Sequence, residues 1–179
     1  MNNLPRIWKS AAMILLTIAL STSVVNAQTK MIRDVQNAKT EFIKTDDLMR
    51  TLFNNAHAYV IFPNVGKGAI GIGGAAGQGI VFQKGKRIGT AKMKQLTIGL
   101  QAGGQAYREV IFFEDEAALD RFKSDNFEFS GQASAVAVTK GASGNVKYND
   151  GVMIFSQQKG GLMYEASLGG QKFDYTPYK

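Results

Sequence analysis

The chain has 179 residues, a formal net charge of +7, no cysteine and one histidine. This length fits a single domain, and the missing cysteines exclude disulfides, while one histidine is too few for a His/Cys metal cluster. The modest basic excess favours anionic partners such as lipid headgroups.

The first 27 residues have the pattern of a secretory signal peptide. Arg6 and Lys9 form a basic start, Ala11–Leu20 is apolar, and small residues lead up to Ala27 at the expected cleavage point. The apolar stretch is shorter than the roughly 20 residues that a spanning helix needs. We therefore expect a periplasmic mature domain over residues 28–179, with an uncleaved anchor as the alternative. Nucleic acid is not an expected partner, because exported proteins rarely meet it.

Two helices are expected at the start of the mature chain. Met31, Val35, Ala38 and Phe42 recur at helical spacing and form one apolar stripe. Asp46 is suited to cap a second helix, whose apolar positions are Leu48, Met49, Leu52, Phe53 and Ala56. Pro63 then ends a short predicted strand, Ala58–Phe62.

The segment Gly66–Gly79 contains seven glycines in fourteen residues. The odd positions from 69 to 79 carry only alanine and glycine, whereas the even positions include isoleucines at 70, 72 and 80. Because side chains alternate between the faces of a strand, this pattern predicts one strand, with or without a bulge, that has one nearly bare face. A bare face permits close approach of another layer or of a ligand. Close packing is the first interpretation, and a ligand slot is the second.

The second half of the chain reads mainly as strands. Alternation over Leu96–Tyr107 predicts a half-buried strand, Arg108–Glu114 continues as a more buried one, and Asp115–Lys123 is a short helix with acids first and bases last. The segments on either side of "QQKGG" suggest a hairpin. The predicted fold class is α+β: a curved, mostly antiparallel sheet of six to eight strands, sandwich- or barrel-like, with two N-terminal helices and one short inserted helix.

Residue patterns typical of enzymes are weak in this sequence. His57 lies between a helix and a strand, where a structural role is the simpler interpretation, and the acids at 114–116 are better explained by the start of a helix. "GIGGAA" matches a dinucleotide-binding spelling, but no helix pattern and no acid about 20 residues later follow it. We expect no catalytic residue, no cofactor and no metal.

A basic segment is the main candidate for binding. Its five cations, with no acid between them, are Lys84, Lys86, Arg87, Lys92 and Lys94. Gly85 permits a tight turn within this segment. Basic residues near an anionic membrane contribute about 1 kcal/mol each. The alternative is an exposed hairpin that lysines keep soluble and protect from edge pairing.

Several stretches resemble the SYLF domain, also called the Ysc84 actin-binding domain. They are "AHAYVIFPNVGKGAIGIGGAAGQGIVF", "LTIGLQAGGQAYREVIFFEDEAALDRF" and "GVMIFSQQKGGLMYEASLGG", which occur in the family's order. The likeness covers about Lys30 to Gly170.

The resemblance implies binding to anionic lipids and, in fungal members, to actin filaments. An exported bacterial-type protein meets no actin, so the expected partner is anionic phospholipid at the cell envelope. Eukaryotic members use an amphipathic N-terminal helix at the membrane. The segment Lys30–Lys44 lies in the matching place, which adds Lys30 and Arg33 to the candidate lipid-binding residues. A non-enzymatic protein-interaction or structural module is the alternative function.

Overall fold

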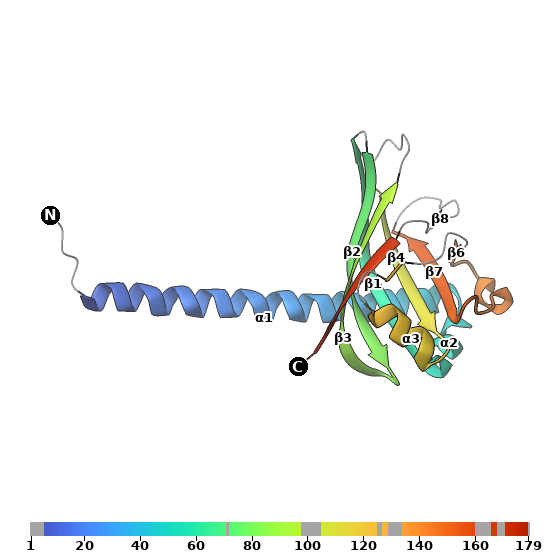
Figure 1. The fold of residues 1–179 in the computed structure, drawn as a ribbon, viewed down its shortest axis with the longest axis horizontal. Coiled ribbons are helices and arrows are strands. Elements are labelled where there is room, and N and C mark those ends of the chain that lie inside the picture. Colours follow the sequence, from blue (N-terminus) through green and yellow to red (C-terminus); the bar gives the residue numbers. More distant parts are fainter. Residues whose placement is uncertain are drawn as a thin grey trace. The chain divides into compact units, whose positions relative to one another are not determined.

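The computed structural model describes residues 6–70, 72–97, 105–124, 127–128, 134–159, 166–167 and 171–178. The chain divides into two compact units, Met1–Arg33 and Asp34–Lys179. The helices are α1 (Arg6–Thr45), α2 (Met49–Asn55) and α3 (Glu116–Lys123), with a 3-10 helix η1 (Ala142–Asn145). The strands are β1 (Ala58–Ile70), β2 (Ile72–Gln83), β3 (Lys86–Thr97), β4 (Gln105–Phe113), β5 (Phe127–Glu128), β6 (Ser134–Ala137), β7 (Val152–Gln158), β8 (Ala166–Ser167) and β9 (Gln171–Pro177), as Figure 1 shows.

The described strands form a sheet in the order β5-β9-β3-β2-β1-β4-β7-β6-β8. Neighbouring strands are antiparallel except for β6 and β7, which run parallel. The predicted α+β class, with three helices and a mostly antiparallel sheet, is confirmed. The described sheet has nine strands, more than the predicted six to eight, because this total includes β5 and β8, which are only two residues long.

The sheet curls into a half-barrel that encloses an apolar core. The rings of Phe62 on β1 and Phe173 on β9 lie 5.8 Å apart, although β2 and β3 separate these two strands in the sheet. On this concave face, α3 inserts Phe122 between Phe113 and Phe173, with ring distances of 4.9 and 5.3 Å. These contacts fix the curvature, because aromatic side chains from distant strands must meet in one cluster.

The opposite, convex face is covered by α2 and by the part of α1 that begins at Asp34. Phe53 of α2 packs edge-on against Tyr59 and Phe112, with ring centroids 5.1 and 4.9 Å away. Val35 and Phe42 of α1 are 2% and 0% exposed. The predicted apolar stripe is therefore part of the protein core from Val35 onward, whereas Met31 is only partly buried. Within the described residues, no helix combines the length and the apolar character needed to cross a membrane.

The glycine-rich segment forms two strands, so the prediction of one strand is wrong. β1 continues through Pro63 to Ile70, β2 starts at Ile72, and these two isoleucines pair with each other. β1 passes through Pro63 because a bulge lies there: the register shifts between Ile61 and Asn64. A bulged residue makes no regular ladder bond, which suits a proline without an N–H. Gly71 lies outside the described residues.

Two strand predictions in the second half need correction. β8 pairs with β6, whereas β7 pairs with β4 and β6, so the described residues around "QQKGG" do not form a hairpin. The predicted strand over Leu96–Tyr107 contains the end of β3 and the start of β4, which are not neighbours in the sheet; residues 98–104 between them lie outside the described residues.

The acids at the start of α3 have the structural role expected of them, whereas the predicted cap of α2 is wrong. Asp115 is the N-cap of α3: its Oδ1 accepts a hydrogen bond from the Ala118 N–H at 2.8 Å. For α2 the N-cap residue is Leu48, not Asp46. Asp46 Oδ1 accepts from the Leu48 N–H at 3.1 Å, but Oδ2 accepts from the backbone N–H and the hydroxyl of Ser143, at 2.8 and 2.7 Å. Asp46 thus joins the α1–α2 junction to η1.

Candidate functional site

The turn between β2 and β3 carries the first group of predicted cations. Lys84 and Gly85 both have positive φ angles, 49° and 75°. Two consecutive left-handed residues are the geometry of a two-residue hairpin turn, which matches the natural twist of its strands. Lys84, Lys86 and Arg87 are exposed and form no ion pair with any described residue. We call these three residues the hairpin cations.

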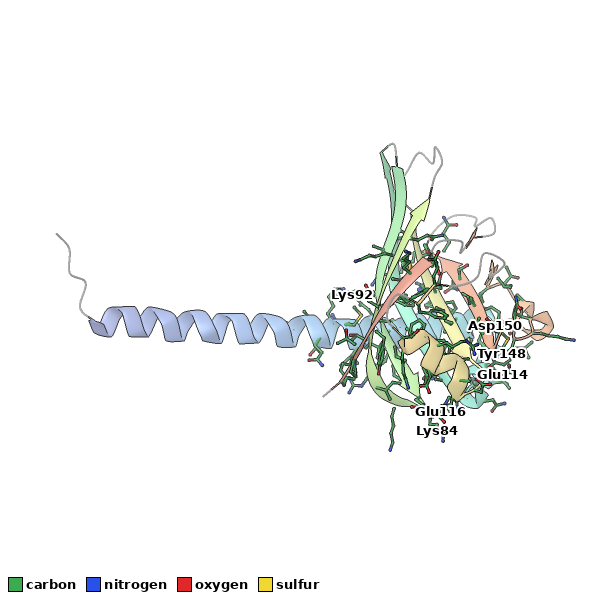
Figure 2. The ribbon with its side chains drawn as sticks, in the orientation of Figure 1. Lys84, Lys92, Glu114, Glu116, Tyr148 and Asp150 are labelled. Atoms are coloured by element: carbon green, nitrogen blue, oxygen red, sulfur yellow. The ribbon has the colours of Figure 1, made fainter. Side chains whose placement is uncertain are left out.

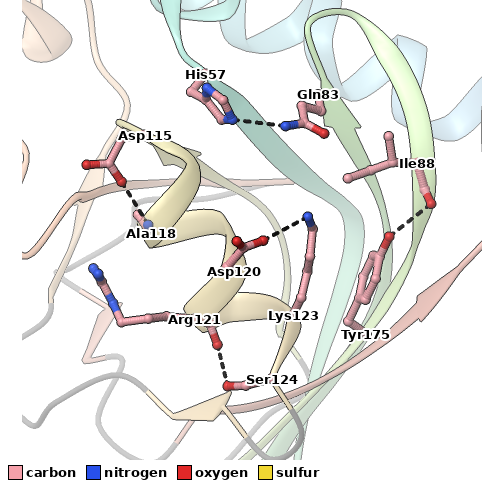
Figure 3. Close-up of polar contacts among 10 residues, drawn as sticks. All are labelled: His57, Gln83, Ile88, Asp115, Ala118, Asp120, Arg121, Lys123, Ser124 and Tyr175. Carbon is pink, nitrogen blue, oxygen red and sulfur yellow. Dashed lines mark hydrogen bonds and ion pairs between the residues drawn. The ribbon is translucent and has the colours of Figure 1, made fainter.

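Hydrogen bonds hold the base of this hairpin in place (Figure 3). Gln83 Nε2 lies 2.9 Å from His57 Nε2, and the Lys84 N–H donates to the His57 carbonyl at 3.3 Å. On the other strand, the Ile88 carbonyl accepts from the Tyr175 hydroxyl at 2.9 Å. His57 therefore has the structural contacts predicted for it, and the hairpin cations stand on a fixed support.

Lys92 and Lys94 form a second group on the convex face of β3. Both are exposed, whereas Met93 between them is buried in the core. They border a shallow depression of about 330 Å³ that is also lined by Ala76, Gly77 and Gln78. Lys94 Nζ lies 3.9 Å from Asp174 Oδ2, but the two side chains are 74% and 53% exposed, so this pair contributes little to stability.

The predicted basic segment is therefore two groups, not one. Eight residues of extended chain separate Lys86 from Lys94, which corresponds to about 25 Å. Figure 2 shows Lys84 and Lys92 at separate places on the β2–β3 ladder. Each group is exposed, but a single small headgroup cannot touch both.

Carboxylates share the end of the sheet where the hairpin cations lie. Ala58 pairs with both Gln83 and Phe113, so the next residues, Lys84 and Glu114, lie two strands apart, about 10 Å. Glu116, the first residue of α3, follows Glu114 by two residues in the chain. The net positive charge of this end is smaller than that of the hairpin alone, a feature that the sequence spacing does not reveal.

The remaining two candidates, Lys30 and Arg33, lie in the amino-terminal unit. Both are exposed on α1. They supply positive charge, whereas the apolar stripe that follows them is used inside the Asp34–Lys179 unit. The helix can therefore offer charge from these residues, but its buried apolar side chains are not available to a membrane.

Sequence reasoning missed a buried polar cluster on the concave face. Gln171 Nε2 donates to Glu109 Oε2 at 3.2 Å, and both side chains are 0% exposed. A signal was present: Glu109 alternates with Tyr107, Ile111 and Phe113, so it occupies a core-facing position of its strand.

The fold and its surface define a small α+β domain that presents cations on a hairpin with a hydrogen-bonded base. Within the described residues, no group of three or more His, Cys, Asp or Glu side chains is arranged to hold a metal ion. Residues 94–176 match the Ysc84 family model, described as "Las17-binding protein actin regulator". This match confirms the predicted resemblance to the SYLF (Ysc84) family, which is known for lipid or actin binding.

A curated relative gives a second comparison. The chain is 29% identical over 158 residues to "Beta cell expansion factor A" of Aeromonas veronii. The match covers 87% of this chain and 56% of the relative. The chain thus spans about half the length of the curated relative that it matches.

Proposed function

We propose that this chain is an exported, non-enzymatic lipid-binding module that associates with anionic phospholipid at the cell envelope. The observation that carries the proposal is the set of exposed hairpin cations, which pair with no described residue and stand on a hydrogen-bonded support. The signal-like first 27 residues support a periplasmic location, and the family's association with lipid supports the ligand class.

The hairpin cations suit a surface of phosphate groups. They are already solvated and unpaired, so binding breaks no ion pair with another described residue. At about 1 kcal/mol for each cation near an anionic surface, the three contribute about 3 kcal/mol, or roughly a hundredfold in affinity. Lys92 and Lys94 are additional contacts for a surface large enough to reach them, such as a membrane. Lys30 and Arg33, in the amino-terminal unit, are separate candidate lipid contacts.

Charge reversal tests the proposal. A variant carrying Lys84→Glu, Lys86→Glu and Arg87→Glu should lose co-sedimentation with phosphatidylglycerol vesicles, with at least a hundredfold weaker binding, because attraction becomes repulsion. Binding of the unchanged protein should also weaken as salt rises from about 0.01 to 0.15 M, since the screening length falls from about 30 to 8 Å.

The matched control reverses charge elsewhere on the same domain. Lys140 and Lys147 are exposed on the loop around η1, and Lys140→Glu with Lys147→Glu should retain most of the binding. If the hairpin variant sediments as fully as the unchanged protein, the hairpin is not the docking site. If the unchanged protein binds no anionic vesicle, lipid binding itself is wrong, and a protein-interaction module becomes the better account.

A further inference from the structure

The concave face contains a layer of buried polar side chains that core packing does not require. Among the described residues, four of the buried polar side chains point into the half-barrel from β3, β4, β7 and β9: Gln95, Glu109, Ser156 and Gln171. Their strand partners place them together: Gln95 lies opposite Gln171, and Glu109 lies opposite Ser156. The Gln171–Glu109 hydrogen bond links the two pairs across the interior.

Two side-chain carbonyl oxygens, one in this layer and one next to it on the same face, accept no hydrogen bond from any described residue. Gln171 directs its Nε2 to Glu109, and its Oε1 is buried without a donor. Gln158 lies opposite Tyr107 on the same face, and its Oε1 is likewise buried without a donor. Buried polar atoms are normally hydrogen-bonded, because an unpaired one keeps its full desolvation cost. Gln171 is completely buried, so bulk water does not reach its side chain.

The surroundings of these two oxygens specify the kind of partner that would suit them. The two Oε1 atoms are acceptors near one buried carboxyl group, Glu109, so a group that complements them must be a hydrogen-bond donor and preferably a cation. A primary ammonium group has three N–H donors and no acceptor, and its hydrogen bonds to oxygen are charge-assisted. A quaternary ammonium group has the same charge but no N–H donor.

We propose that this polar layer binds a primary ammonium group, carried either by an ethanolamine phospholipid or by a free amine. Glu109 supplies the negative charge, and the Oε1 atoms of Gln171 and Gln158 accept two of the three N–H bonds. The layer lies on the concave face and the hairpin cations lie at the β2–β3 turn, so this inference does not rest on the proposed function and the two can fail separately.

The test compares two small cations that differ in their donors. Ethanolamine should raise the melting temperature of the full-length protein in a concentration-dependent way, whereas choline at equal concentration should not, because it lacks N–H groups. Gln158→Met should weaken ethanolamine binding about tenfold in calorimetric titration, from the loss of one bond to a charged donor. Gln78→Met, an exposed glutamine on the convex face, is the matched control and should bind normally.

Two outcomes of this comparison would contradict the proposal. Equal shifts with ethanolamine and choline, or no shift with either, would overturn it and leave water as the occupant of the layer. Normal ethanolamine binding by Gln158→Met would overturn the role of this oxygen. If the layer has only a structural role, Gln158→Met should change the stability of the protein but not the difference between the melting-temperature shifts caused by ethanolamine and by choline.

Vesicles distinguish the two sources of the ammonium group. Phosphatidylglycerol vesicles are prepared with an equal fraction of either phosphatidylethanolamine or phosphatidylcholine. Tighter binding to the ethanolamine vesicles, lost in Gln158→Met, assigns the site to a lipid headgroup. Binding of free ethanolamine without this difference assigns it to soluble amines. Phosphatidylglycerol vesicles alone report on the hairpin cations, so failure of the proposed function is seen separately.

Discussion

Replacing Gly79 with alanine is expected to lower the free energy of unfolding by about 1–3 kcal/mol, because the new methyl group has no space. A Cβ at this position would lie 2.6 Å from the Ile61 carbonyl oxygen and 2.9 Å from a ring carbon of Phe62. Gly79 lies opposite the β1 bulge, where two residues of β1 face one of β2. The nearest of these atoms, the Ile61 carbonyl oxygen, belongs to the backbone, so it cannot rotate away from the new methyl group. Urea unfolding monitored by circular dichroism measures the change.

Gly66→Ala is the matched control for this experiment. Gly66 is also a strand glycine in the same β1–β2 pair, but a Cβ there would meet nothing within 4 Å. Its replacement should be neutral or slightly stabilising, because alanine loses less conformational freedom on folding. Equal losses in the two variants would show that the glycines serve backbone freedom and not close approach of the strands.

Asp46→Ala is expected to cost about 2–3 kcal/mol of unfolding free energy, since hydrogen bonds to a charged acceptor are among the stronger ones. Asp46 is 2% exposed and accepts hydrogen bonds from the Leu48 N–H and from the N–H and hydroxyl of Ser143. Removing the carboxylate leaves the donors of Ser143 buried without this acceptor. Asp47→Ala, an exposed neighbour, should change stability by less than about 0.5 kcal/mol. Comparable losses in both variants would contradict the assigned role.

The same carboxylate should make stability depend on pH. Burial alone would raise the pKa of Asp46, but the hydrogen bonds from Ser143, Leu48 and Gly141 lower it below its ordinary value of 3.8. A group with a lower folded pKa contributes fully above the unfolded pKa and loses this contribution as pH falls through the folded pKa. The stability difference between the unchanged protein and Asp46→Asn should therefore shrink below about pH 4. A difference that is constant across pH would contradict this.

Elements with a local physical signal are predictable from this sequence. The helix over Asp115–Lys123 has an N-cap, an acid in its first turn and two bases in its last, and each of these acts within a few residues. The stripe containing Val35 and Phe42 follows the helical period, and the same residues are buried in the structure. Sequence alone leaves open whether such a stripe faces a membrane or a core, because both surfaces are apolar.

Features that depend on distant partners are not predictable in the same way. Small residues continue from β1 into β2. The alternation of small and larger residues in the sequence therefore gives no sign that the segment forms two strands. The bulge at Pro63 depends on Gly79, which lies sixteen residues later in the chain. Five cations within eleven residues read as one cluster, but an extended strand separates Lys86 from Lys94. The Glu109–Gln171 contact arises only when the sheet curls.

The most direct test of membrane docking through the hairpin places an environment-sensitive fluorophore on the protein. The chain has no cysteine, so Lys86→Cys and Lys140→Cys each provide one labelling site with the same loss of charge. On addition of phosphatidylglycerol vesicles, the label at position 86 should shift its emission to shorter wavelength, and the label at position 140 should not. A shift at position 140 with none at position 86 would show that another face of the domain meets the membrane.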